Sequence, residues 1–136
     1  MRVSLLSLHP LLLALFLTGC GDSSDPPDCP SLPGCRENGL CTAEGDRCIA
    51  GSDADCRDRS EVCSKLGRCT ALDGTCQATS DADCKASAFC QIYGGCHAKD
   101  GVCLALTDDD CKDSSGCKQY GWCTANDQGE CVKMGP

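Results

Sequence analysis

The sequence predicts a small disulfide-rich fold of four tandem units of about 27 residues, each a short helix and a β-hairpin clamped by two disulfides. Two observations lead to this class. Seventeen of the 136 residues are cysteine, and after residue 19 most hydrophobic residues are cysteine or alanine. So few large apolar side chains cannot build one sizeable core, and cross-links are expected to replace it.

The first 19 residues have the parts of a secretory leader. Arg2 precedes a leucine-rich run over 5–17, and small residues stand before Cys20. The run is shorter than the ~20 apolar residues that span a bilayer. We therefore expect residues 1–19 to be a signal peptide.

The end of this leader, Leu-Thr-Gly-Cys at 17–20, resembles the lipobox of bacterial lipoproteins. The resemblance implies diacylglyceryl transfer to Cys20, cleavage before it and acylation of the new N-terminus. Acyl chains on Cys20 would anchor the chain to a membrane of the cell envelope without spanning it. Gly21, in place of the aspartate that favours inner-membrane retention in that family, favours the outer membrane, with the chain periplasmic or surface-exposed. Residues 20–28 would form a lipidated polar tether.

The other sixteen cysteines fall into four sets of four. The first cysteines of successive sets are 27, 28 and 27 residues apart, which defines repeats at 29–55, 56–83, 84–110 and 111–136. The predicted disulfide cysteines are Cys29, Cys35, Cys41, Cys48, Cys56, Cys63, Cys69, Cys76, Cys84, Cys90, Cys96, Cys103, Cys111, Cys117, Cys123 and Cys131.

Their spacing favours disulfides over metal or redox chemistry. Zinc, iron–sulfur, haem and thioredoxin-like motifs place cysteines about two to four residues apart. Here neighbouring cysteines are never closer than six positions. In an exported chain we therefore expect eight disulfides, two in each unit, and neither a metal site nor a cofactor.

Each of the last three units opens with a helix signal. A serine or threonine stands three residues before an aspartate, as in a capping box, and a glycine follows where a helix would end in the left-handed conformation. The predicted N-caps are Ser52, Ser80 and Thr107, and the predicted terminal glycines are Gly67, Gly94 and Gly121. These signals predict helices at about 53–66, 81–93 and 108–120. In the first unit Pro30 and Pro33 fall where the helix should run, so an irregular terminal copy is expected.

Every unit carries a hairpin signal between its third and fourth cysteines. Asp73–Gly74 and Asp100–Gly101 suit type I′ turns, and Gly45–Asp46 suits type II′. Asp127–Gly129 suits a three-residue loop that ends in a left-handed glycine. Such hairpins place the third and fourth cysteines on one face, which argues against a bridge between them. Two pairings stay open, and the chain reversal favours first with fourth and second with third.

The acidic helix starts also raise the possibility of calcium. In an EF-hand loop beginning at the first aspartate, the fifth position would be Arg57, Lys85 or Lys112, a cation where a ligand is required. Capping accounts for these acids more simply, and a calcium-binding envelope protein is kept as an alternative. His97 is the one histidine after the leader, and no serine lies in a nucleophile-elbow pattern, so no catalytic residues are predicted.

Residues that differ among the copies are the better guide to binding. Directly before the third cysteine of the four units stand Leu40, Arg68, Gly95 and Trp122. Directly before the nearby glycine stand Asn38, Leu66, Tyr93 and Tyr120. Tyr120 and Trp122 are candidate contact residues, because aromatics are enriched in binding hot spots, or they cover the bridges of the last unit. Removal of Arg2 with the leader lowers the formal net charge from −8 to −9, which disfavours nucleic acid as a partner.

In its spacing and its Ser-Asp-Xaa-Asp-Cys signature, the stretch 29–131 resembles the uncharacterised four-cysteine tandem repeats of predicted lipoproteins in myxobacteria and related bacteria. That resemblance brings no activity with it. The sequence therefore predicts a non-enzymatic envelope lipoprotein, held at the membrane through Cys20, that presents a protein- or glycan-binding surface or acts as a spacer. A secreted-type protease inhibitor or effector, with a hairpin as bait, is the alternative from another class.

Overall fold

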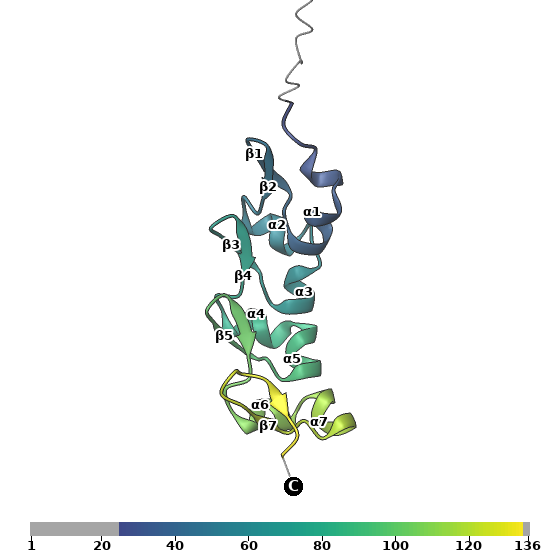
Figure 1. Ribbon diagram of the computed structural model, residues 1–136, viewed down its shortest axis with the longest axis vertical. Helices are drawn as coiled ribbons and strands as arrows, with labels where there is room; N and C mark the ends of the chain where they lie inside the picture. Colours follow the sequence, from purple (N-terminus) through teal and green to yellow (C-terminus); the bar gives the residue numbers. More distant parts are fainter. Residues whose placement is uncertain (1–24, 135–136) are drawn as a thin grey trace, which may run out of the picture.

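The computed structural model describes residues 25–134, so the predicted leader, Cys20 and the first part of the predicted tether lie outside the described residues. Four similar units follow one another along a rod, with helices on one side and hairpins on the other (Figure 1). Each hairpin is its own two-stranded antiparallel sheet. These repeated, disulfide-linked units confirm the predicted fold class.

Each unit consists of two short helical segments followed by a hairpin. The first unit contains η1 (Cys29–Ser31), α1 (Pro33–Asn38), β1 (Thr42–Glu44) and β2 (Arg47–Ile49). The second contains α2 (Asp53–Arg57), α3 (Val62–Leu66), β3 (Thr70–Leu72) and β4 (Thr75–Gln77). The third contains α4 (Asp81–Ala86), α5 (Ala88–Tyr93), β5 (His97–Lys99) and β6 (Val102–Leu104). The fourth contains α6 (Asp108–Lys112), α7 (Ser115–Tyr120), β7 (Thr124–Ala125) and β8 (Cys131–Val132).

The prediction of one continuous helix in each of the last three units is wrong, because a serine divides each of these helices in two. The buried hydroxyl of Ser87 donates to Cys84 O at 2.7 Å and accepts from Cys90 N at 3.2 Å. It thus ends α4 and caps α5. Ser114 makes the equivalent two bonds in the fourth unit, and Ser60 bonds Cys56 O at 2.9 Å in the second.

The predicted N-caps have different outcomes. Thr107 forms a complete capping box with Asp110, and Ser80 accepts from two backbone N–H groups of the first turn of α4. Ser52 is the N-cap of α2, as predicted, but its side chain makes no capping bond, so the expected capping box is not formed. The carboxylate of Asp55, its expected partner, accepts from the Thr42 hydroxyl of the preceding unit and from Gly51 N.

The first unit is more regular than expected. Pro30 and Pro33 do not prevent helix formation, because they lie at the starts of η1 and α1. A proline in the first turn loses no intrahelical hydrogen bond, and its fixed φ suits a helix start. This unit therefore keeps a helix, α1, that carries its second cysteine.

The hairpin predictions are confirmed. Asp73 and Gly74 have φ of 50° and 74°, and Asp100 and Gly101 have 51° and 80°, as a type I′ turn requires. In the fourth unit the loop is longer and ends in Gly129 at a φ of 77°. Cys76 lies opposite Ala71 in the register of its hairpin, as expected.

In every unit the first cysteine is bonded to the fourth and the second to the third. The pairs are Cys29–Cys48, Cys35–Cys41, Cys56–Cys76, Cys63–Cys69, Cys84–Cys103, Cys90–Cys96, Cys111–Cys131 and Cys117–Cys123. The first cysteine of each unit is fully buried. Around these bridges lie only small clusters, such as Ala50, Val62 and Ala71 beside Cys56–Cys76. The disulfides thus form the centre of each unit, as the scarcity of large apolar residues led us to expect.

Two contacts recur at each of the three junctions between units. Ala50 N, Ala78 N and Ala105 N each donate to a glycine carbonyl in the next hairpin turn, at 2.9 Å. In addition, the left-handed glycine that ends the second helix lies against the first–fourth disulfide of the next unit. A Cβ on Gly67 would lie 2.6 Å from Cys103 Sγ. The units are therefore packed directly on one another as one rod.

Candidate functional site

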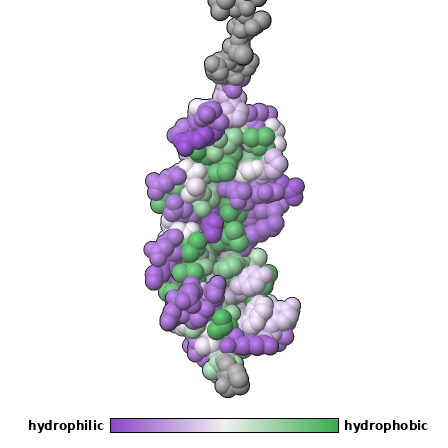
Figure 2. Space-filling model, in the orientation of Figure 1, coloured by the Kyte–Doolittle hydropathy of each residue, from purple (hydrophilic) through white to green (hydrophobic). Residues whose placement is uncertain are grey.

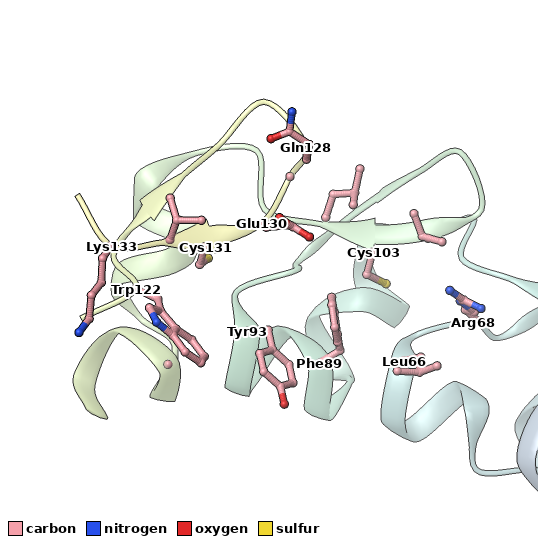
Figure 3. Close-up of a pocket in the computed structure, with 15 residues that line it drawn as sticks. Leu66, Arg68, Phe89, Tyr93, Cys103, Trp122, Gln128, Glu130, Cys131 and Lys133 are labelled. Carbon is pink, nitrogen blue, oxygen red and sulfur yellow. The ribbon is translucent and has the colours of Figure 1, made fainter. Parts of the chain in front are cut away.

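Side chains of three units line an apolar groove of about 690 Å³ on the rod. The apolar part of its lining consists of Leu66, Phe89, Tyr93, Val102, Leu104, Trp122 and Val132. Figure 3 shows Leu66, Phe89, Tyr93 and Trp122 in a row along the helical side, opposite the hairpins. Tyr93 is 48% exposed and Leu66 is 37% exposed, so this apolar surface faces solvent. A large exposed apolar surface of this kind is typical of an interaction site.

Short helices and tight turns position the groove residues. Phe89 and Tyr93 are four residues apart on α5, which places their rings on one face with centroids 5.2 Å apart. Trp122 follows the left-handed turn at Gly121, where the chain leaves α7. On the other side, β6 and β8 contribute the residues next to the fourth cysteines. The helices and strands that carry the groove residues on both sides are thus cross-linked by disulfides.

The two candidate contact residues lie side by side but face different hollows. Tyr120 and Trp122 have ring centroids 4.8 Å apart. Trp122 is half-buried and lines the groove, whereas Tyr120 is 54% exposed and lines a second hollow at the end of the rod. Trp122 also packs over Gly116, beside the Cys117–Cys123 bridge. Both interpretations of the tryptophan, groove contact and bridge cover, therefore have a structural basis.

Phe89 is a groove residue that the copy comparison missed. It stands before the second cysteine of its unit and fills the space beside Gly95, where a Cβ would overlap its ring. In the fourth unit the sizes are exchanged, because Gly116 stands before the second cysteine and Trp122 before the third. The first unit has the same exchange with Gly34 and Leu40. This inverse relation in size, which Val62 and Arg68 of the second unit do not follow, was the sequence signal that would have paired Phe89 with Gly95.

Basic residues stand at the two ends of the groove. Arg68 and Lys133 lie at opposite ends of the row in Figure 3, with Glu130 between them on the hairpin side. Among the eleven arginines and lysines of residues 25–134, six form ion pairs with carboxylates, and Arg68, Lys85, Lys99, Lys118 and Lys133 form none. One carboxylate oxygen of Glu130 accepts from Asn126 Nδ2 at 3.2 Å.

The first aspartate of each acidic motif serves its own hairpin. Asp53 accepts from Ala71 N at 2.8 Å, Asp81 from Ala98 N at 2.7 Å and Asp108 from Ala125 N at 2.9 Å. Each bond joins the helix to the outer edge of the first strand and satisfies an N–H that would otherwise be open to another chain. The bond from Ala98 is the main reason that the pKa of Asp81 lies below its ordinary value.

The aspartate directly before the first cysteine of each of the last three units connects its unit to the preceding one. Asp55 accepts from the Thr42 hydroxyl at 2.7 Å, and Asp83 takes two bonds from the Arg57 guanidinium at 2.9 and 3.1 Å. Asp110 lies 3.2 Å from His97. All three aspartates that directly precede a first cysteine thus act at a junction between units.

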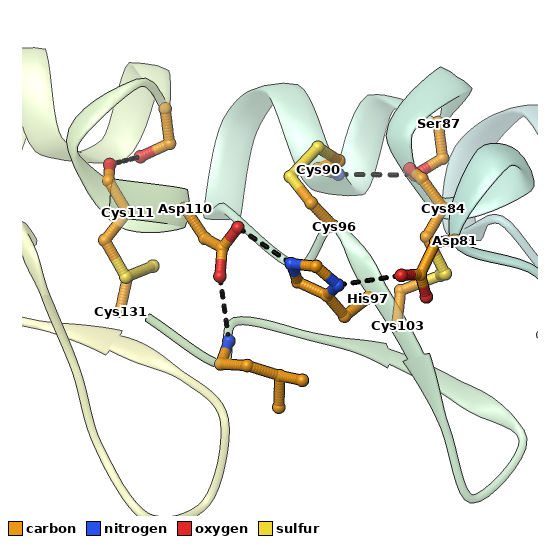
Figure 4. The surroundings of a disulfide bond; sticks show 12 residues. Asp81, Cys84, Ser87, Cys90, Cys96, His97, Cys103, Asp110, Cys111 and Cys131 are labelled. Atoms are coloured by element: carbon orange, nitrogen blue, oxygen red, sulfur yellow. Dashed lines mark hydrogen bonds and ion pairs between the residues drawn. A yellow bond between two sulfur atoms is a disulfide. The ribbon is translucent and has the colours of Figure 1, made fainter. Parts of the chain in front are cut away.

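His97 bridges two carboxylates rather than pointing freely into solvent (Figure 4). Its Nδ1 lies 2.9 Å from Asp81 of its own unit, and its Nε2 lies 3.2 Å from Asp110 of the next. Partial burial acts to raise the pKa of Asp110, but hydrogen bonds from Thr107 and Leu106 and the charge of His97 outweigh it, so the pKa lies below its ordinary value. The bridge ties the third unit to the fourth.

These contacts bear on the calcium alternative. The acidic side chains bond backbone N–H groups, hydroxyls and cations, as the folding account of the motif requires. Within residues 25–134, no group of three or more His, Cys, Asp or Glu side chains is arranged to hold a metal ion. No helix in the described part of the chain has the length and hydropathy of a membrane span.

Comparison of the chain with models of protein families, with curated proteins and with solved structures finds no match. The site is therefore interpreted from its own residues. They form an apolar groove with basic ends on a small disulfide-rich rod. On the face drawn in Figure 2, hydrophobic residues follow the long axis of the rod between hydrophilic flanks.

Proposed function

We propose that the chain is a non-enzymatic, lipid-anchored rod of the bacterial cell envelope whose groove binds a protein or glycan ligand. The leader and the stretch 17–20 support the anchor at Cys20, with the outer membrane favoured. The tether would leave the rod free to extend from the membrane surface. The disulfides suit an oxidising compartment.

One observation carries the binding role: residues that vary among the four units gather in the groove. The recurrent residues have folding tasks, since the cysteines cross-link, the aspartates bond N–H groups and the glycines allow close packing. Leu66, Arg68 and Trp122 differ from their counterparts in all the other units, and Tyr93 differs from those in the first two; all four line the groove. Variation on a repeated frame is how repeat proteins diversify their binding surfaces.

The anchor is tested by membrane fractionation of cells that express the full chain. The natural chain should enter the membrane fraction and shift in mass when globomycin blocks lipoprotein cleavage. Cys20→Ala should leave the chain unlipidated, and Cys48→Ala serves as a matched cysteine variant that keeps the lipid. Equal fractionation of the natural and Cys20→Ala chains would refute the anchor.

The groove is tested by comparing two truncations of exposed apolar side chains. Tyr93→Ala removes groove surface, whereas Leu72→Ala removes a side chain that is 46% exposed and outside the groove. Oxidised protein immobilised through a C-terminal affinity tag, which leaves Lys133 of the groove unmodified, would be incubated with envelope extract, and the bound material quantified. Tyr93→Ala should reduce specific capture several-fold while Leu72→Ala does not. Equal capture by both variants would argue against the groove as the binding site.

A protease inhibitor with a bait hairpin is the second candidate, and one structural feature favours it. The turns of the last three hairpins are bonded to the preceding unit, but the tip of the first hairpin projects freely, with nothing within 4 Å of a Cβ on Gly45. The test is inhibition of serine or cysteine proteases by the oxidised protein. Inhibition that is lost when Asp46 is replaced by proline, but kept when Asp73 is replaced by proline, would favour this candidate over the groove.

A further inference from the structure

We propose that the groove binds an extended peptide segment whose apolar side chains are flanked by carboxylates. This inference rests on the proposed function, because it names the ligand of the same groove. The proposed ligand is a peptide rather than a glycan, and this peptide is acidic rather than basic.

The lining favours a peptide over a sugar chain. A sugar ring can stack its C–H face on an aromatic side chain, but its hydroxyls surround the ring edge, and each one that is buried needs a hydrogen-bond partner. Along the row from Leu66 through Phe89 and Tyr93 to Trp122, the groove offers apolar side chains, and the basic groups stand at its ends. Apolar peptide side chains would bury this surface without leaving polar groups unsatisfied.

The ends of the groove select the charge of the ligand. Arg68 is half-buried, and among residues 25–134 no carboxylate pairs with it or with Lys133. A guanidinium takes a carboxylate through two parallel hydrogen bonds, which makes Arg68 the stronger of the two recognition groups. The intervening Glu130 is hydrogen-bonded to Asn126, and it disfavours a carboxylate at the middle of the ligand.

The rest of the surface sharpens this selection. With the leader removed, the chain carries a formal net charge of −9 and repels acidic segments in general. In the described part of the chain Lys85, Lys99 and Lys118 also lack carboxylate partners, but they stand outside the groove, so Arg68 and Lys133 are the basic residues that can accept an acidic segment there. An extended backbone directs alternate side chains to the same face, so the ligand should have apolar residues at every second position.

Trp122 supplies a direct measurement, because it is the single tryptophan of the chain and lines the groove. The probe is the peptide acetyl-Glu-Ser-Leu-Ser-Phe-Ser-Val-Ser-Glu-amide, in which both Glu share a face with the apolar residues, titrated into the oxidised protein at low salt. Two peptides serve as comparisons, one with both Glu replaced by Lys and one with the three apolar residues replaced by Ser. A soluble N-acetylglucosamine oligosaccharide tests the glycan. Only the Glu-flanked apolar peptide should give a saturable change in tryptophan emission.

Arg68→Gln should weaken binding of the Glu-flanked peptide by about tenfold or more, since it removes hydrogen bonds to a charged group. Lys133→Gln should weaken it about twofold to fivefold, as an exposed ion pair does. Lys99→Gln is the matched control, because it removes the same charge from an exposed strand residue outside the groove and should leave affinity unchanged. Circular dichroism of each variant should match that of the natural chain.

The possible outcomes separate this inference from the proposed function. Equal or tighter binding of the Lys-flanked peptide, or an unchanged affinity in Arg68→Gln, overturns the acidic ligand and keeps the groove as a peptide site. Binding of the oligosaccharide alone overturns the peptide and keeps the binding role. If no probe binds and Tyr93→Ala captures as much envelope material as the natural chain, both are overturned.

Discussion

Gly94 ends α5 in the left-handed conformation directly against Cys131, and a Cβ on this glycine would lie 2.6 Å from the Cys131 sulfur. The contact joins the third unit to the fourth. Gly121 has the same role in its own helix, with a φ of 74° against 76° for Gly94. Its Cβ would meet nothing closer than Lys133 Cε at 3.7 Å. Substituting each of the two glycines therefore distinguishes the cost of backbone strain, which both positions share, from the cost of overpacking at a junction, which arises at Gly94.

Gly121→Ala should destabilise the protein by ~1–2 kcal/mol, which is the cost of a left-handed alanine. Gly94→Ala should carry the same strain and a further ~1–3 kcal/mol for overpacking against the disulfide and the backbone of Asp110. Guanidinium unfolding of the oxidised proteins measures both values. Equal destabilisation by Gly94→Ala and Gly121→Ala would contradict the overpacking, because the junction would then accommodate the extra methyl group without cost.

Stability should fall in acid through the aspartates at His97. The pKa values of Asp81 and Asp110 lie below their ordinary range in the folded chain, for Asp81 chiefly because Ala98 N–H bonds its carboxylate. Folding therefore favours their ionised forms. Their contribution is complete above the unfolded pKa of ~3.9 and is lost as the pH falls through the lower folded values.

Urea midpoints measured from pH 7 down to pH 2 should accordingly drop below about pH 4. Asp110→Asn should flatten this drop, since an amide has no proton to gain. Asp109→Asn is the control, because the side chain of Asp109 is 88% exposed, and it should follow the natural curve. A curve for Asp110→Asn as steep as that of the natural chain would contradict the assignment.

Asp55→Ala should cost ~1–3 kcal/mol, because it leaves the Gly51 N–H and the Thr42 hydroxyl without their acceptor beneath the first junction. Asp55 is 1% exposed, so water does not readily replace the carboxylate. Glu44→Ala breaks an exposed ion pair with Arg47 and should cost less than ~1 kcal/mol. Hydrogen exchange of the Gly51 amide should accelerate in Asp55→Ala alone, and unchanged protection there would refute the role of this carboxylate.

The two kinds of disulfide should differ in what they contribute. Cys84–Cys103 closes a separation of 19 residues, and Cys90–Cys96 closes one of 6. In the chain-entropy account, the longer loop gives ~1 kcal/mol more stabilisation. Cys84 is also fully buried. Replacing Cys84 and Cys103 by alanine should therefore destabilise the protein more than replacing Cys90 and Cys96, as unfolding free energies would show; the reverse order would contradict this account.

Local chemistry explains which elements were predictable. A type I′ turn requires positive φ at two successive residues, and Asp–Gly pairs tolerate this better than most, so Asp73–Gly74 and Asp100–Gly101 mark the hairpins within a few residues. Thr107 and Asp110 cap a helix within one turn. The interruption at Ser87 was missed because a buried serine that bonds the backbone looks, in sequence, like an ordinary polar helix residue.

By itself, the sequence determined the repeat, the hairpin turns, the glycine helix ends and the grouping of sixteen cysteines into four sets, because each depends on residues within one unit of the chain. Only the tertiary structure decided how the units pack. That packing turned Asp55 from a cap into a junction contact and brought Leu66, Phe89 and Trp122 to one groove. Residues on three separate units meet only through the rotation and rise between units, and that geometry arises from the glycine, disulfide and carboxylate contacts at the junctions rather than from any local propensity.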